Sequence, residues 1–100
     1  MIGIIYIIGE KAAPNSISCK SKFEKAQLFL EDRGFRVVNP IAIITNKNLD
    51  INDAIQTNIK SLMRCDSVYI LPDVSINKTQ NVELLLAIEL KLIILQGIQF

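Results

Sequence analysis

The fold of this chain is decided by the stretch Cys65-Asp66-Ser67-Val68-Tyr69-Ile70-Leu71-Pro72-Asp73, followed by residues 77–90. Its pattern is that of a buried strand, a polar loop and a very apolar helix that contains one carboxylate, Glu83. A strand that leads into a helix in this way places backbone N–H groups and acidic side chains at the carboxyl end of a sheet. Proteins of the α/β class bind their ligands at that end. The stretch therefore predicts an α/β fold with a binding edge.

Three more strands are predicted from apolar runs. Residues 2–8 form a nearly unbroken apolar run, which is typical of a strand covered on both faces in a parallel sheet. Gly9 ends this run, and residues 10–18 are expected to form an exposed loop. Residues 35–39 and 92–95 predict two shorter strands. With the strand at 67–71, the sheet has four strands.

The helices are predicted from capping residues and apolar stripes. Ser21 and Glu24 have the spacing of a capping box, which predicts the start of the first helix, and Gly34 is suited to end it. Asp50 or Asn52 can cap the second helix. Its buried stripe is expected at Ile55, Ile59 and Leu62. The order β-α-β-α-β-α-β predicts a flavodoxin-like or Rossmann-like three-layer sandwich, with a four-stranded parallel sheet between helices.

Composition limits the possible functions. One hundred residues, half of them apolar, are enough for a single domain with its own core, at residues 1–100. The formal net charge of +1 argues against a nucleic-acid-binding protein, which normally has a basic face. No apolar run approaches the roughly 20 residues of a membrane span. We therefore expect no nucleic-acid partner and no membrane.

The residue types that are missing narrow the chemistry further. The chain has no histidine, which excludes Ser-His-Asp and Cys-His nucleophile systems and a histidine metal site within one chain. Cys19 and Cys65 lie far apart without a Cys-x-x-Cys spacing, which fits reduced thiols in the cytoplasm. Neither a metal nor another cofactor is expected. Carboxylates, tyrosine, lysine or the backbone must perform any catalysis.

Glu83 is the strongest candidate for chemistry. It falls in the first or second turn of the third helix, where the helix dipole stabilises an anion by about 0.3–1 kcal/mol. An ionised carboxylate is the state that a nucleophile needs. The alternative is that Glu83 only complements the helix dipole on a solvated face. However, residues 79–90 are apolar nearly all round, which predicts a homo-oligomer interface and places Glu83 near a protected cleft.

Other candidates lie at the same predicted edge. The Tyr6 hydroxyl can orient a carboxylate or a sugar hydroxyl, although a half-buried strand tyrosine without such a role is the more common case. Gly9 is a single glycine and only a weak indication of a phosphate cradle. Asp73 belongs to the polar segment after the third strand. Asp66 lies at the opposite end of that strand and is expected to hold backbone there.

Four segments resemble the nucleoside 2-deoxyribosyltransferase-like superfamily, and in particular a short branch of small bacterial and phage proteins. They span nearly the whole chain and are Tyr6-Ile7-Ile8-Gly9, Gly34 with Val37-Val38-Asn39-Pro40, the strand stretch at 65–72, and residues 77–87 with Glu83 and Ala87. The resemblance implies a carboxylate nucleophile that attacks the anomeric carbon of a 2-deoxyribonucleoside. The sugar then passes to another base or to water.

The resemblance also implies roles for individual residues. Glu83 matches the nucleophile of the family and Tyr6 the tyrosine that positions it, in an active site commonly completed by a neighbouring subunit. Asn58 and Asn77 stand where the transferases carry aspartates that contact the base and the sugar. Asparagine can bind a substrate by hydrogen bonds, but it cannot act as a carboxylic acid. With Gly9 and Asp73, these residues form the expected substrate-binding set.

Three functions therefore stay open. The first is a deoxyribosyltransferase or a (deoxy)nucleoside or nucleotide N-glycosidase that uses Glu83. The second is a non-catalytic nucleoside- or nucleotide-binding module. The third is an interaction protein that assembles through its apolar third helix.

Overall fold

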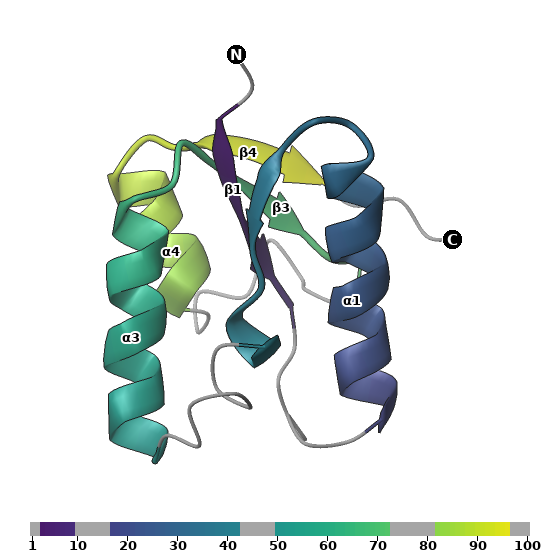
Figure 1. Cartoon of the computed structure of the whole chain (residues 1–100). Coiled ribbons are helices and arrows are strands. Elements are labelled where there is room, and N and C mark those ends of the chain that lie inside the picture. The colour runs from purple at the N-terminus through teal and green to yellow at the C-terminus, as the bar shows by residue number, and fades with distance from the viewer. Residues whose placement is uncertain (1–2, 10–16, 43–49, 73–81, 97–100) are drawn as a thin grey trace.

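The computed structural model describes residues 3–9, 17–42, 50–72 and 82–96 (Figure 1). Strands and helices alternate in the described chain. The strands are β1 (Ile4–Ile8), β2 (Arg36–Val38), β3 (Ser67–Ile70) and β4 (Ile93–Gln96), and the long helices are α1 (Ile17–Glu31), α3 (Ile51–Met63) and α4 (Val82–Glu89). The predicted alternation of strands and helices is confirmed.

The four strands form one parallel sheet in the order β2-β1-β3-β4. Helix α1 covers one face of the sheet, and α3 and α4 cover the other face (Figure 1). This is the predicted three-layer architecture. After β1 the chain adds β2 on one side and then β3 on the other side, so the sheet has a topological switch point between β1 and β3.

The alternation of side chains along β1 divides the core into two layers. Ile5 and Ile7 point to the α1 side, whereas Tyr6 and Ile8 point to the side of α3 and α4. The α1 layer also contains Cys19, Phe23, Ala26, Leu30, Ile41, Tyr69 and Leu71. The opposite layer contains Leu62, Cys65, Val68, Ile70, Leu84 and Ala87. Because both faces of β1 and β3 are covered, their sequences read as continuous apolar runs.

Three predicted local features are confirmed. Gly34 follows α1 with a φ of 92°, a conformation that favours glycine, and its N–H donates to the Glu31 carbonyl at 2.9 Å. Asp50 is the N-cap of α3, since its Oδ1 accepts from the Asp53 N–H at 2.8 Å. Asp66 holds backbone at the amino end of the sheet, where its Oδ2 accepts from the Ile4 N–H at 2.9 Å.

The predicted start of the first helix was wrong. Ile17 is already helical, so Ser21 and Glu24 lie inside α1 and do not form a capping box, and residues 17 and 18 do not belong to a loop. Cys19 and Phe23 are both buried and lie one turn apart on the same face of α1. Helix α1 therefore packs against the sheet from Cys19 onward, which lies before Ser21, the predicted start.

The predicted buried stripe of the second helix is confirmed at Leu62 and wrong at Ile55. Ile55 is 51% exposed and Ile59 is only partly buried, whereas Ala54, Asn58 and Leu62 are buried. These three residues are spaced by one turn and face the sheet together. The prediction relied on the large apolar isoleucines, but the small Ala54 and the amide Asn58 lie on the inner face of α3 together with Leu62.

Candidate functional site

The structure brings Tyr6 and Glu83 together across 77 positions of sequence. Tyr6 lies in the central strand β1 and is fully buried, and its hydroxyl donates a hydrogen bond to Oε2 of Glu83. Glu83 is half-buried in the first turn of α4. Tyr6 and Glu83, the two candidate catalytic residues from the sequence analysis, therefore form one hydrogen-bonded pair.

This pair lies at the place where parallel sheets bind ligands. The helices run antiparallel to the strands, so the N-terminal turns of α3 and α4 are at the carboxyl end of the sheet (Figure 1). Glu83 is in such a first turn, and its partner Tyr6 is on a strand that borders the switch point between β1 and β3. Ligands of open α/β sheets bind outside the carboxyl ends of the strands at this point.

The environment of Tyr6 determines what its hydroxyl can do. Burial raises the pKa of Tyr6 far above its ordinary value of 10.0, and the charge of Glu83 and the hydrogen bond to it raise the pKa further. The phenol therefore stays protonated at neutral pH. It can donate a hydrogen bond and orient the carboxylate, but it cannot act as a base.

Asn58 lies in the same layer of the molecule. It is one turn before Leu62 on α3, as Glu83 is one turn before Ala87 on α4, and Leu62 and Ala87 belong to the same core cluster as Tyr6. Helices α3 and α4 contact each other on this face of the sheet, so Asn58 and Glu83 are carried by neighbouring helices.

The amide of Asn58 has an unusual environment. The residue is only 5% exposed, and its Oδ1 is buried without a hydrogen-bond partner in the described structure. Buried polar atoms normally have a partner, because an unsatisfied one costs about 1–3 kcal/mol. Asn58 therefore holds a buried acceptor for which the described chain provides no donor.

Gly9 is explained by packing. It is buried at the end of β1, and a Cβ at this position would be 2.5 Å from Cδ1 of Leu71 and 2.8 Å from Cζ of Phe23. Leu71 and Phe23 belong to the α1 layer. A side chain at position 9 would therefore point into that layer and away from the layer that holds Tyr6 and Glu83. The close approach of these side chains requires glycine whether or not a ligand binds nearby.

Two members of the predicted substrate-binding set, Asp73 and Asn77, lie outside the described residues. Their roles remain predictions.

The Cys65 thiol is protonated at neutral pH. Burial, with a contribution from the charge of Asp66, raises the pKa of Cys65 to about 11, which does not favour a nucleophilic thiolate.

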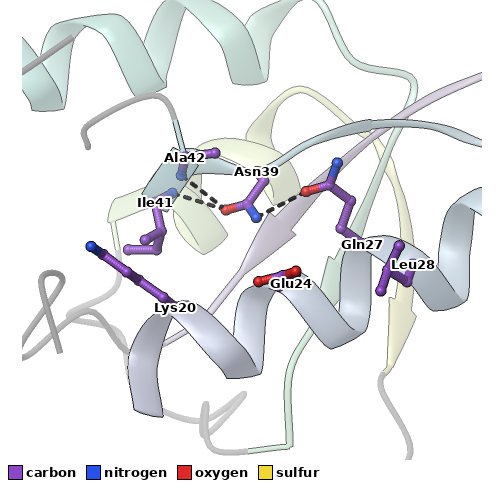
Figure 2. Close-up of a pocket in the computed structure, with 7 residues that line it drawn as sticks. All are labelled: Lys20, Glu24, Gln27, Leu28, Asn39, Ile41 and Ala42. Carbon is purple, nitrogen blue, oxygen red and sulfur yellow. Dashed lines mark hydrogen bonds between the residues drawn. The ribbon is translucent and has the colours of Figure 1, made fainter. Parts of the chain in front are cut away.

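A pocket that the sequence did not predict lies between α1 and the end of β2. It has a volume of about 350 Å³, and Lys20, Glu24, Gln27, Leu28, Asn39, Ile41 and Ala42 line it (Figure 2). It is in the α1 layer, on the other side of the sheet from Tyr6 and Glu83.

The Asn39 side chain joins the two walls of this pocket by hydrogen bonds. Its Oδ1 accepts from the N–H groups of Ile41 and Ala42 at 3.0 and 3.3 Å, and its Nδ2 donates to Gln27 Oε1 at 3.0 Å (Figure 2). Asn39 therefore caps the helical turn at 40–42, which Pro40 begins. The pair Asn39-Pro40 is the sequence signal for this turn. Both polar atoms of the buried Asn39 amide therefore have hydrogen-bond partners within the protein.

Comparison with known proteins gives one match. A family model described as "Domain of unknown function (DUF4406)" matches residues 5–96, which include both Tyr6 and Glu83. No curated protein and no solved structure matches the chain. Within the described residues, no helix has the length and apolar content required to cross a membrane.

Proposed function

We propose that this chain, which belongs to the DUF4406 family of domains of unknown function, is a nucleoside 2-deoxyribosyltransferase or an N-glycosidase of (deoxy)nucleosides or nucleotides. One observation carries the proposal: the buried Tyr6 hydroxyl holds the Glu83 carboxylate in the first turn of α4, beside the switch point of the sheet. The resemblance to the nucleoside 2-deoxyribosyltransferase-like superfamily implies the same two residues for this chemistry.

The reaction proceeds in two steps. In the first step a carboxylate oxygen of Glu83 attacks the anomeric carbon of the 2-deoxyribose. The bond from that carbon to the base breaks, its electron pair stays on the base nitrogen, and this nitrogen takes up a proton from solvent water as the base leaves. The sugar is then held as an ester of Glu83. In the second step water or another base attacks the same carbon and gives up a proton to solvent, and the electron pair of the ester bond returns to the Glu83 carboxylate.

Tyr6 has a positioning role in this proposal. Its hydroxyl stays protonated and donates to Oε2 of Glu83, which fixes the carboxylate relative to the sheet. A hydrogen bond to a charged group contributes about 1.5–3 kcal/mol, which corresponds to roughly a 10- to 150-fold change in an equilibrium or a rate. We expect Tyr6→Phe to lower kcat/KM within this range while cleavage still depends on Glu83.

The substrate contacts come from Asn58 and from residues around the carboxyl edge. The Oδ1 of Asn58, which has no hydrogen-bond partner among the described residues, accepts an N–H or O–H of the ligand once the ligand reaches this buried oxygen. Asn77 contacts the sugar in place of an aspartate, and Asp73 and the backbone at Gly9 complete the set. No metal and no other cofactor is needed for the two steps.

A non-catalytic nucleoside- or nucleotide-binding module is the second candidate, and Asn58 favours it. A buried amide binds a ligand by hydrogen bonds, but it cannot deliver a proton to a leaving base as a carboxylic acid does. In this case ligands raise the melting temperature without being cleaved.

The test uses the purified chain with a panel of deoxynucleosides and deoxynucleoside monophosphates, with and without a second base. Chromatography measures the released free base. We expect release by the wild type and only background release by Glu83→Gln, which keeps the size of the side chain and its ability to accept a hydrogen bond from Tyr6.

The control is Glu89→Gln, because Glu89 lies at the other end of α4 and is exposed. It should release base as the wild type does. Full release by Glu83→Gln contradicts the proposal. Absence of release with a ligand-dependent shift of the melting temperature selects the binding module.

We further propose that the protein works in the cytoplasm. The thiols of Cys19 and Cys65 are both buried, and neither forms a disulfide within the described residues, as expected where thiols stay reduced.

A further inference from the structure

The two edges of the sheet differ in how they are protected. Edge strands expose unpaired backbone groups, and proteins usually blunt them with short strands, charges or prolines. Strand β2 has these devices: it has three residues, begins with the exposed Arg36, and Pro40 follows it closely. Strand β4 has four residues, and residues 92–96 contain no charge and no proline.

Strand β4 is also exposed on both of its faces. Val68 and Ile94 are partners across β3 and β4, so Ile94 shares the α3 and α4 face with Val68 and is 40% exposed. Ile93 and Leu95 share the α1 face, where they are 64% and 36% exposed. Among the described residues, β4 is therefore an apolar edge strand with no strand on its outer side, whereas the β2 edge is short and begins with a charged residue.

We infer that β4 pairs with β4 of a second copy of this chain, so that two sheets join into one of eight strands. An axis of two-fold symmetry perpendicular to the sheet makes the two β4 strands antiparallel and keeps each sheet face on its own side. Residues that face α1 in one copy then meet residues that face α1 in the other copy. Closed two-fold dimers are the commonest soluble assemblies, and both copies use the same surface.

The symmetry restricts the register. Opposite residues must share a face, which allows Ile93, Ile94 or Leu95 on the axis. We propose the register centred on Ile94, in which Ile94 lies opposite Ile94 of the second copy and Ile93 lies opposite Leu95 of the second copy. Every exposed apolar side chain of β4 then has an apolar cross-strand neighbour. A shift of two residues would instead place Ile94 opposite Gln96 of the second copy.

Charge favours a second copy as the occupant. An uncharged edge attracts no oppositely charged partner and suffers no like-charge repulsion when it pairs with itself. A stable interface takes about 20–30 residues from each side, so the four residues of β4 need further contacts. Leu85, Ile88 and Leu90, which precede β4 in the chain and are 40–48% exposed, are apolar side chains available for such contacts.

Sedimentation velocity at several protein concentrations tests the assembly. We expect the wild type at twice the chain mass of 11.2 kDa. Ile94→Lys should halve this mass, because it places two ammonium groups opposite each other at the axis. The matched control is Ile55→Lys on α3, an exposed isoleucine outside β4 and α4, which should remain a dimer. A monomeric wild type, or a dimer that Ile94→Lys leaves intact, overturns the proposal.

Cysteine cross-linking tests the register and does not depend on the behaviour of the lysine variant. Under oxidation Ile94→Cys should form a covalent dimer, because residues opposite each other have Cβ atoms about 4.5–5.5 Å apart. Gln96→Cys should not, because its two copies are four residues, or about 13 Å, apart along the strands. The wild type is the blank, since Cys19 and Cys65 are buried. Equal cross-linking at both positions, or none at Ile94→Cys, contradicts this pairing.

Discussion

At the scale of single residues, Tyr6 links the stability of the fold to the candidate site. Its ring fills the layer between β1 and the helices, while its hydroxyl binds Glu83. The same buried position that stabilises the core also keeps the hydroxyl protonated, because burial and the charge of Glu83 raise the pKa of Tyr6. One side chain therefore packs the core and orients the carboxylate.

This coupling predicts a dependence of stability on pH. The unfolded chain releases the Tyr6 proton near pH 10, whereas the folded chain retains it to higher pH. The contribution of Tyr6 to the free energy of unfolding is therefore complete below pH 10 and is lost as the pH rises above 10. In Tyr6→Phe this loss is absent, so the stability difference between wild type and variant should shrink above pH 10.

Urea denaturation between pH 7 and pH 11 measures this difference. At pH 7 we expect Tyr6→Phe to be less stable by about 1–3 kcal/mol, since Glu83 loses a donor. The stability loss between pH 9 and 11 that comes from the raised pKa of Cys65 occurs in both proteins and cancels. A difference that stays constant across the whole pH range would refute the coupling.

The sequence indicated these residues but not their surroundings. An acidic residue in an apolar helix near a strand end made Glu83 a candidate, whereas the positioning role of Tyr6 came from the family resemblance. The lack of a partner for Oδ1 of Asn58 among the described residues and the close approach of Leu71 and Phe23 to Gly9 depend on contacts between distant segments. No local pattern specifies such contacts.

At the scale of elements, some features of a helix depend on a few neighbouring residues, and others depend on how the helix packs against the sheet. The cap at Asp50 and the glycine at Gly34 act within a few residues, and the sequence predicted both. The start of α1 and the inner face of α3 depend on which residues meet the sheet. The spacing of Ser21 and Glu24 and the size of Ile55 were therefore misleading.

The cap of α3 gives a direct test at this scale. Asp50→Ala removes the acceptor of the Asp53 N–H and should destabilise the fold by about 0.5–2 kcal/mol, as measured by thermal or urea unfolding. Asn52→Ala is the matched control, because Asn52 is exposed inside the first turn and does not cap the helix. Equal losses in both variants would show that Asp50 does not act as the cap.

At the scale of the whole molecule, the strand order creates the candidate site. The alternation of strands and helices predicted a parallel sheet, but it did not predict the order β2-β1-β3-β4. This order places β1 beside β3 at a switch point, with α4 on the face that Tyr6 reaches. It also leaves β4 as an uncharged edge, from which the proposed pairing with a second copy follows.

In the proposed reaction Glu83 forms a covalent bond with the sugar. Mass spectrometry after rapid acid quenching of protein mixed with a cleavable deoxynucleoside tests this bond most directly, with peptide mapping to locate the modified residue. We expect a 2-deoxyribosyl group on Glu83 in the wild type, more of it in Asn58→Asp because the added acid speeds base departure, and none in Glu83→Gln. Base release without any adduct, or an adduct on a residue other than Glu83, would refute Glu83 as the nucleophile.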